Sequence, residues 1–306
     1  MGTWGFKLYQ DDDALDLKTL MSVLLKLPKT PNELLEIAIE SIEYEPSIET
    51  LEGQTFWLVI ADIFEKNGIV CKKVFDTAIS IINTGKNTEL LLQHGLDDSL
   101  QSKRIKELGK LRERIENPRL NTKAANKKRL PSFMPTRGDV YSFPTMDGKG
   151  SNPWCKTWSE ANFIPNGWGA MVVLSSGRLF DWYPWFVPVS LDIDSSTEPK
   201  WKDILNSRLI FIDDGAKQSR AASPKKNHFN RMKLNLMGQL EISPSKGDSY
   251  ISTTFFGPKN AVLHEWSIGD QAINIQHPHI KGVKLKSLLL NYENSFLASL
   301  KSWLKK

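Results

Sequence analysis

The sequence has very little cysteine and no long hydrophobic run among its 306 residues. Its two cysteines, Cys71 and Cys155, are too few and too far apart to suggest a disulfide framework or a cysteine-based zinc site. We therefore expect a reducing, cytoplasmic environment. No apolar run approaches the roughly 20 residues that a membrane-spanning helix needs, so no membrane partner is expected. With 40% hydrophobic and 25% charged residues, the composition is typical of a soluble globular protein.

Motifs of known catalytic and phosphate-binding sites are also missing. The sequence has no G-x-S-x-G nucleophile motif, no H-E-x-x-H zinc motif and neither of the common glycine-rich phosphate loops. We interpret the close pair His277 and His279 as part of a surface turn. Asp213 and Asp214 follow a predicted strand and, together with His228, are the best candidates for an enzyme, but a strand-ending turn is the simpler explanation of the two aspartates. We therefore expect no catalytic residues, no metal site and no cofactor.

The charges are divided unevenly along the chain. Residues 1–118 hold 20 acidic and 14 basic residues, whereas the remainder holds 15 acidic and 26 basic residues. The change of sign near residue 118 suggests a domain boundary, and residues 119–133, which are basic and contain prolines, suggest a linker. A basic second half favours partners with acidic surfaces.

Residues 1–118 carry the spacing of amphipathic helices. Apolar residues recur at steps of three and four within 11–27. Thr30, Pro31 and Glu33 then supply an N-cap, a proline at the first helical position and the glutamate of a capping box. Further helical patterns follow at 52–66, 71–83 and 99–116, and Gly68 and Gly85 are suited to end two of these helices. Residues 1–118 therefore predict an all-helical bundle of about five helices.

After residue 133 the pattern changes to short runs rich in Val, Ile and aromatic residues, separated by Gly, Pro, Asn and Asp, which is typical of strands and turns. Ser175-Ser176-Gly177 is the predicted turn of a hairpin. The chain therefore predicts an α+β fold: an N-terminal all-helical bundle, a β-rich small-barrel-like domain and a C-terminal amphipathic helix. The expected segments are a helical domain at 1–118, a linker at 119–133, a β-rich domain at 134–257 and a C-terminal extension at 258–306. Strands are expected near 138–145, 167–176, 177–189, 208–213 and 237–242. One short helix is expected within 228–238 and the last helix within 285–306.

Aromatic residues concentrate in the second half, which holds eight of the ten tryptophans. Neighbouring side chains of a regular strand point to opposite faces, so Trp182 and Tyr183 cannot both point into a core. These rings are either core alone or partly an exposed interface, and an exposed patch of Trp, Tyr and Arg is typical of a binding hot spot. A basic cluster nearby in sequence is either a solvated helix face or part of the same interface. The predicted partner-binding residues are Trp182, Tyr183, Trp185, Lys225, Lys226 and Arg231.

The start of the chain resembles the domain-of-unknown-function 4259 family. The resemblance rests on the opening residues Met1 to Gly5 (MGTWG), the acidic helix start at 11–16 (DDDALD) and the helix pattern at 95–115, and it covers residues 1–118. In this family the turn before the first helix is usually Gly-x-Phe-x-Asn, which Lys7 to Gln10 replace. The resemblance implies a small all-helical domain and carries no activity.

The second half resembles the immunity protein 26 family of bacterial polymorphic toxin systems. The resemblance rests on Gly138-Asp139-Val140, on residues 208–215 (RLIFIDDG) and on residues 228–242 (HFNRMKLNLMGQLEI), and it covers about 134–245. It implies a small β-rich domain that binds a cognate protein toxin without catalysis, which is our leading hypothesis. The alternative is a nucleic-acid-binding component of a bacterial defence or regulatory assembly, because basic segments interleaved with aromatic residues are suited to unpaired bases.

Overall fold

The computed structural model describes residues 5–118, 129–212, 219–253, 255–269 and 279–290. The chain divides into two compact units, residues 1–129 (unit 1) and residues 130–306 (unit 2). The predicted linker at 119–133 therefore spans the division, although residues 119–128 lie outside the described part. Helices and strands together confirm the α+β class. Among the described residues, no helix has the length and apolar character needed to span a bilayer.

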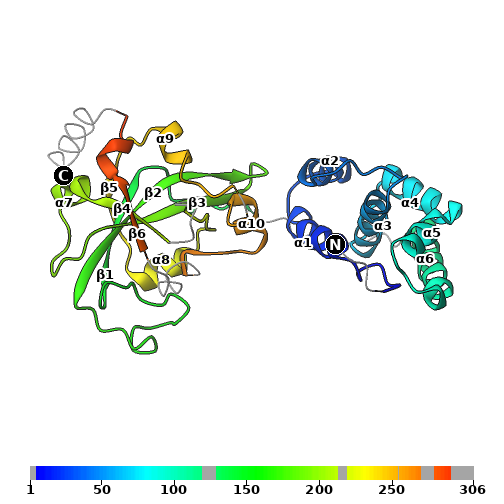
Figure 1. Cartoon of the computed structure of the whole chain (residues 1–306), viewed down its shortest axis with the longest axis horizontal. Helices are drawn as coiled ribbons and strands as arrows, with labels where there is room; N and C mark the ends of the chain where they lie inside the picture. Colours follow the sequence, from blue (N-terminus) through cyan, green and yellow to red (C-terminus); the bar gives the residue numbers. More distant parts are fainter. Residues whose placement is uncertain (1–4, 119–128, 213–218, 254, 270–278, 291–306) are drawn as a thin grey trace. The chain divides into compact units, whose positions relative to one another are not determined.

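The described part of unit 1 is helical throughout, with α3 in the middle of the packing (Figure 1). Nearly all of α3 is buried, and it packs against α1, α4, α5 and α6. The elements are α1 (Asp12–Leu24), α2 (Pro31–Ser41), α3 (Leu51–Lys66), α4 (Lys72–Thr84), α5 (Lys86–Gln93), a short 3-10 helix η1 (Asp98–Leu100) and α6 (Gln101–Glu116). The sequence pattern missed α5, because it follows α4 after the single residue Gly85.

The predicted helix boundaries of unit 1 arise from local capping. The capping box at the start of α2 is present, since the Thr30 N–H donates to Glu33 Oε2 at 2.8 Å and the Glu33 N–H donates to Thr30 Oγ1 at 3.3 Å. Asp11 caps α1 through its side chain. Gly85 ends α4 with φ +71°, a left-handed conformation in which glycine has no steric penalty.

Unit 1 also contains a buried polar network between α3 and α6. Asp62 accepts hydrogen bonds from Tyr9 Oη at 2.6 Å, Lys66 Nζ at 2.7 Å and Arg114 Nη2 at 2.5 Å. The other guanidinium branch of Arg114 pairs with Glu65 at 2.7 Å. Burial acts to raise the pKa of Asp62, but the hydrogen bonds from Lys66, Tyr9 and Arg114 outweigh burial and hold that pKa below its ordinary value. The network thus depends on an ionised Asp62.

The six described strands of unit 2 form one antiparallel sheet in the order β5-β1-β2-β3-β4-β6 (Figure 1). The sheet is open, with β5 and β6 as its edges, so the predicted barrel-like shape is not confirmed. The strands are β1 (Asp139–Thr145), β2 (Gly167–Leu179), β3 (Tyr183–Leu191), β4 (Arg208–Ile212), β5 (Asn235–Gln239) and β6 (His279–Lys284); the short helices are α7 (Trp201–Asn206), α8 (Lys226–Met232), α9 (Pro244–Asp248), α10 (Pro258–Leu263) and the 3-10 helix η2 (Leu285–Leu288).

The predicted hairpin turn at Ser175-Ser176-Gly177 was wrong. These residues lie inside β2, and the chain reverses at 180–182, between Leu179 and Tyr183. Gly177 is needed within the strand because the Trp185 ring lies directly across from it: a Cβ on Gly177 would come 2.7 Å from Trp185 Cζ2. The sequence pattern therefore predicted a turn at a glycine that in fact makes room for a tryptophan on the neighbouring strand.

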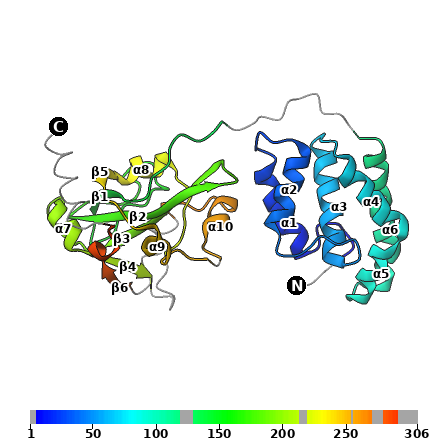
Figure 2. The ribbon, with the colours of Figure 1, turned by 90° about the horizontal axis from the view of Figure 1, so that it is seen from above.

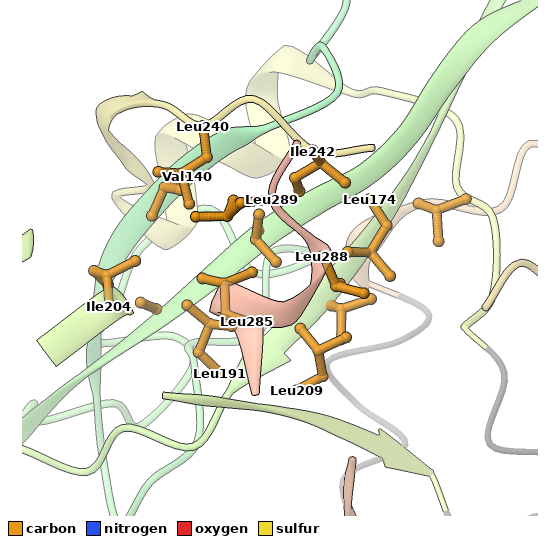
Figure 3. Packing of buried hydrophobic residues seen from close by; sticks show 14 of the residues in the cluster. Val140, Leu174, Leu191, Ile204, Leu209, Leu240, Ile242, Leu285, Leu288 and Leu289 are labelled. Atoms are coloured by element: carbon orange, nitrogen blue, oxygen red, sulfur yellow. The ribbon is translucent and has the colours of Figure 1, made fainter. Parts of the chain in front are cut away.

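Side chains alternate between two hydrophobic clusters, one on each face of the sheet. One face carries Val172 and Leu174 of β2, and the opposite face carries Met171 and Val173. Figure 3 shows the first cluster, in which Leu285, Leu288 and Leu289 pack against strand residues of the sheet. The second cluster includes Phe186, Phe229 and Met232, and α8 covers this face (Figure 2).

The described residues after 257 are part of the unit 2 fold. Ala261 of α10 and Leu285 of η2 are completely buried in the first cluster, and β6 pairs with β4. The part of 258–306 that the structure describes thus completes the core instead of forming a separate extension. Of the predicted C-terminal helix within 285–306, residues 285–288 form only the 3-10 helix η2, Leu289 is extended, and residues 291–306 lie outside the described part.

Candidate functional site

The tip of the β2–β3 hairpin (residues 179–183) exposes polar and aromatic groups in a strained turn. The Trp182 N–H donates to the Leu179 carbonyl at 3.1 Å, and both central residues, Phe180 and Asp181, are left-handed with φ +54° and +55°. Trp182 is partly buried, and its Nε1 finds no acceptor within the described part of the chain. Arg178 holds the turn by donating to the Trp182 carbonyl at 2.8 Å. The tip is therefore a fixed feature of the surface.

A second group of rings forms an aromatic cluster at the end of α10, defined here as Phe255, Phe256, His264 and Trp266. Phe255 is 58% exposed and lies 5.0 Å from Trp266 between ring centroids. His264 is exposed and stacks on Trp266 with an interplanar angle of 22°. The guanidinium of Arg220 lies 3.7 Å from the Phe256 ring centroid. Mutual ring contacts hold these side chains in place while leaving apolar surface exposed.

The hairpin tip and the aromatic cluster lie at the same end of unit 2. The helix α10 packs against β2 and β3, and Figures 1 and 2 both place it beside the end of the hairpin. Tyr183 is buried, and burial together with the nearby Glu265 carboxylate raises its pKa to about 12. We call the combined surface of the hairpin tip and the aromatic cluster the aromatic end. Of its rings, Phe255 and His264 are exposed, and the others are partly or fully buried.

The predicted basic residues lie elsewhere, on and beside α8. Lys226 is exposed, and Lys225 Nζ lies 4.9 Å from the ring centroid of Trp154, a tryptophan that is 46% exposed. Arg231 is partly buried and donates to the Pro153 carbonyl at 2.9 Å, so it fastens the neighbouring loop to α8. Lys225, Lys226 and Trp154 therefore form a small basic surface, to which Arg231 contributes mainly as a brace.

The structure separates these basic residues from one of the predicted aromatic residues. Trp185 is only partly exposed and packs against the core cluster on the sheet face opposite α8. Of the six predicted partner-binding residues, only Trp182 and Tyr183 belong to the aromatic end, and Tyr183 contributes as a buried support. Strand alternation places Trp185 and Phe186 on opposite faces, which separates Trp185 from α8.

The remaining candidates from the sequence form no described reaction centre. Asp213, Asp214 and His277 lie outside the described residues, and His279 begins β6. His228 is 4% exposed and its Nδ1 lies 3.0 Å from the Oγ of Ser267, which is completely buried. Within the described part of the chain, no three His, Cys, Asp or Glu side chains are grouped so that they could hold a metal ion.

Sequence reasoning missed Phe255, Phe256 and His264 as surface residues. The available signal was the pair Phe255-Phe256 directly before Gly257-Pro258, because two adjacent aromatic residues ahead of a turn, outside any strand pattern, cannot both be buried easily. The clustering itself could not be seen, because the chain must fold back after α10 to bring His264 and Trp266 against them.

Comparison of the chain with protein-family models, curated proteins and solved structures found no match. The two family resemblances of the sequence therefore stay predictions.

Proposed function

We propose that this chain is a non-catalytic, immunity-type protein that binds a cognate bacterial toxin and neutralises it by stoichiometric association. The observation that supports the proposal is the aromatic end, where rings of the cluster remain exposed although they contact one another. The likeness to the immunity protein 26 family supplies the kind of partner. Cys71 and Cys155 are free thiols, which supports a cytoplasmic location for this function.

Binding through this surface has a simple energetic basis. Burying an aromatic ring removes a large apolar area from water, and interface energy concentrates in a few aromatic and arginine side chains. Phe255 is 58% exposed and lies against Trp266, so little side-chain freedom remains to be lost when a partner covers it.

The test is binding of the full chain to the toxin domain encoded beside it, measured by titration calorimetry and by relief of growth arrest on co-expression. We expect Phe255→Ala to weaken binding by about 2 kcal/mol, roughly thirtyfold in Kd. The matched control is Ile164→Ala, since Ile164 is also apolar, 79% exposed and in unit 2. The proposal is wrong if the wild-type chain neither binds the toxin nor restores growth.

One observation favours the second candidate, binding of single-stranded nucleic acid at the α8 surface. There, Lys225 covers an exposed Trp154, and Lys226 adds a second exposed charge. Binding of this type weakens steeply with salt because counterions are released from the phosphates. A salt-dependent affinity for an oligonucleotide that Lys226→Ala reduces and Phe255→Ala leaves unchanged would favour this candidate over toxin binding.

A further inference from the structure

Two tight turns of unit 2 adopt the same left-handed conformation with very different residues. In the turn at 146–149, Asp147 and Gly148 have φ +53° and +75°, and this Asp-Gly pair is among those that such turns favour. At the hairpin tip the same two positions are Phe180 and Asp181. A bulky residue at positive φ is a steric outlier, so the hairpin tip is strained where the other turn is not.

Two helix ends of unit 2 show a similar contrast. Lys233 directly follows α8, and Glu265 is the second residue after α10. Both are left-handed, with φ +55° and +52°, and backbone hydrogen bonds of the same spacing close both ends. Lysine at this place complements the negative end of the helix dipole, whereas glutamate opposes it. Glu265 is therefore unfavourable both for its conformation and for its charge.

Phe180, Asp181 and Glu265 lie at the aromatic end, whereas the left-handed Lys233 lies at the end of α8 and has the favourable charge for that place. Neither the Asp181 nor the Glu265 carboxylate makes a hydrogen bond or ion pair within the described part of the chain, and both residues are exposed. Trp182 Nε1 adds a buried donor that finds no acceptor among the described residues. These polar groups make no hydrogen bond or ion pair that would stabilise the described part of the fold. Strained or unfavourable residues concentrate at functional sites, so their placement points to recognition of a partner.

We propose that the strained aromatic end recognises a cationic protein surface, namely an apolar pocket bordered by lysine or arginine. Phe180 and Phe255 enter the pocket, while Asp181 and Glu265 pair with the basic border. The inference rests on the proposed function and specifies its partner: the toxin presents a basic, concave face to Asp181 and Glu265. This partner differs from the acidic surface that the net positive charge of the second half predicts, because the two carboxylates set the charge at the binding surface itself. Charge complementarity supplies the association rate, and the rings supply the lifetime of the complex.

The experiment uses the full chain and the purified toxin domain encoded beside it. The double variant Phe180→Asn/Asp181→Gly replaces the strained pair by one that the turn favours. We expect its thermal midpoint to rise by roughly 2 to 4 °C and its affinity for the toxin domain to fall at least about tenfold. The matched control is Lys233→Gly, which relieves a left-handed residue at α8 and should raise the midpoint without changing the affinity.

A second pair of measurements tests the charge. We expect Asp181→Asn/Glu265→Gln to slow association with the toxin domain several-fold at about 50 mM salt and to have little effect at about 500 mM salt. Unchanged association at low salt would overturn the cationic partner. If the wild type binds the toxin but the Asn-Gly variant binds equally well, or is not stabilised, this inference fails while the proposed function stands. If the wild type does not bind the toxin at all, the proposed function itself fails.

Discussion

Replacing Gly138 by alanine is expected to unfold unit 2 while leaving unit 1 folded. Gly138 precedes β1 with φ +87°, and a Cβ added there would lie 1.9 Å from the Leu240 carbonyl oxygen. That contact is with backbone, so no side chain can move aside. The clash could be relieved only by breaking two backbone hydrogen bonds of Gly138. The Gly138 N–H donates to the Val173 carbonyl at 2.8 Å, and the Gly138 carbonyl accepts from the Leu240 N–H at 2.9 Å.

We expect this substitution to lower the free energy of unfolding of unit 2 by about 4 kcal/mol, which approaches the whole stability of many domains. The control is Gly148→Ala, which has φ +75° and no atom within 4 Å of the added Cβ, so only the backbone strain of about 1 kcal/mol remains. Amide hydrogen exchange measures the two units separately: protection of β1 and β2 should be lost and protection of α3 retained. Equal effects of the two substitutions would show that the close approach of Gly138 to Leu240 does not exist in solution.

The second large effect is expected in unit 1, from Asp62→Asn. The Asp62 side chain is 3% exposed and accepts from three donors, whereas an asparagine offers one acceptor oxygen and places an N–H₂ group against the remaining donors. Removing one member of a buried ion-pair network is strongly destabilising. We therefore expect a loss of about 3 kcal/mol at neutral pH, seen as faster exchange of the α3 and α6 amides.

The effect of Asp62→Asn should depend on pH with a definite sign. Because the pKa of Asp62 is lower in the folded than in the unfolded chain, ionisation of Asp62 stabilises the fold fully above the ordinary carboxyl pKa of about 3.9. This stabilisation disappears as the pH falls through the lowered folded value. The difference between wild type and variant should therefore shrink below about pH 4.

The matched control for Asp62 is Asp76→Asn. Asp76 also pairs with a lysine four residues away on a helix of unit 1, but both partners are exposed. Exposed pairs of this kind contribute only about 0.3 to 0.5 kcal/mol, so we expect a small change in stability. A loss at Asp76 as large as that at Asp62 would contradict the role of burial in this argument.

The helical unit was more predictable from sequence than the sheet unit. The Thr30 capping box and the Gly85 helix stop act between residues three or four apart, so their signals survive without knowledge of the fold. The predicted hairpin turn was misplaced because Gly177 leaves room for the ring of Trp185 on the next strand and does not form a turn. The residues next to Gly177 in the sequence carry no information about such a cross-strand contact.

The residues of the candidate site were likewise only partly predictable from the sequence. Trp182 was found from composition, and it does lie at the aromatic end, but Trp185 lies against the core and the α8 lysines lie on the opposite face. Phe255 was missed although it is 58% exposed, since its neighbours in the cluster come from both sides of α10. Spacing along the chain indicates which residues share a face only within one element.

The sequence by itself determined the helical character of unit 1, the change to strands after the basic segment, and the excess of aromatic residues in unit 2. Each depends on period, capping or composition, which act over a few residues. The tertiary structure alone decided that the sheet is open, that Leu285 and Leu288 complete its core, and that the hairpin tip meets the aromatic cluster. These features depend on contacts between residues tens of positions apart, and such contacts are settled by the packing of whole elements against one another.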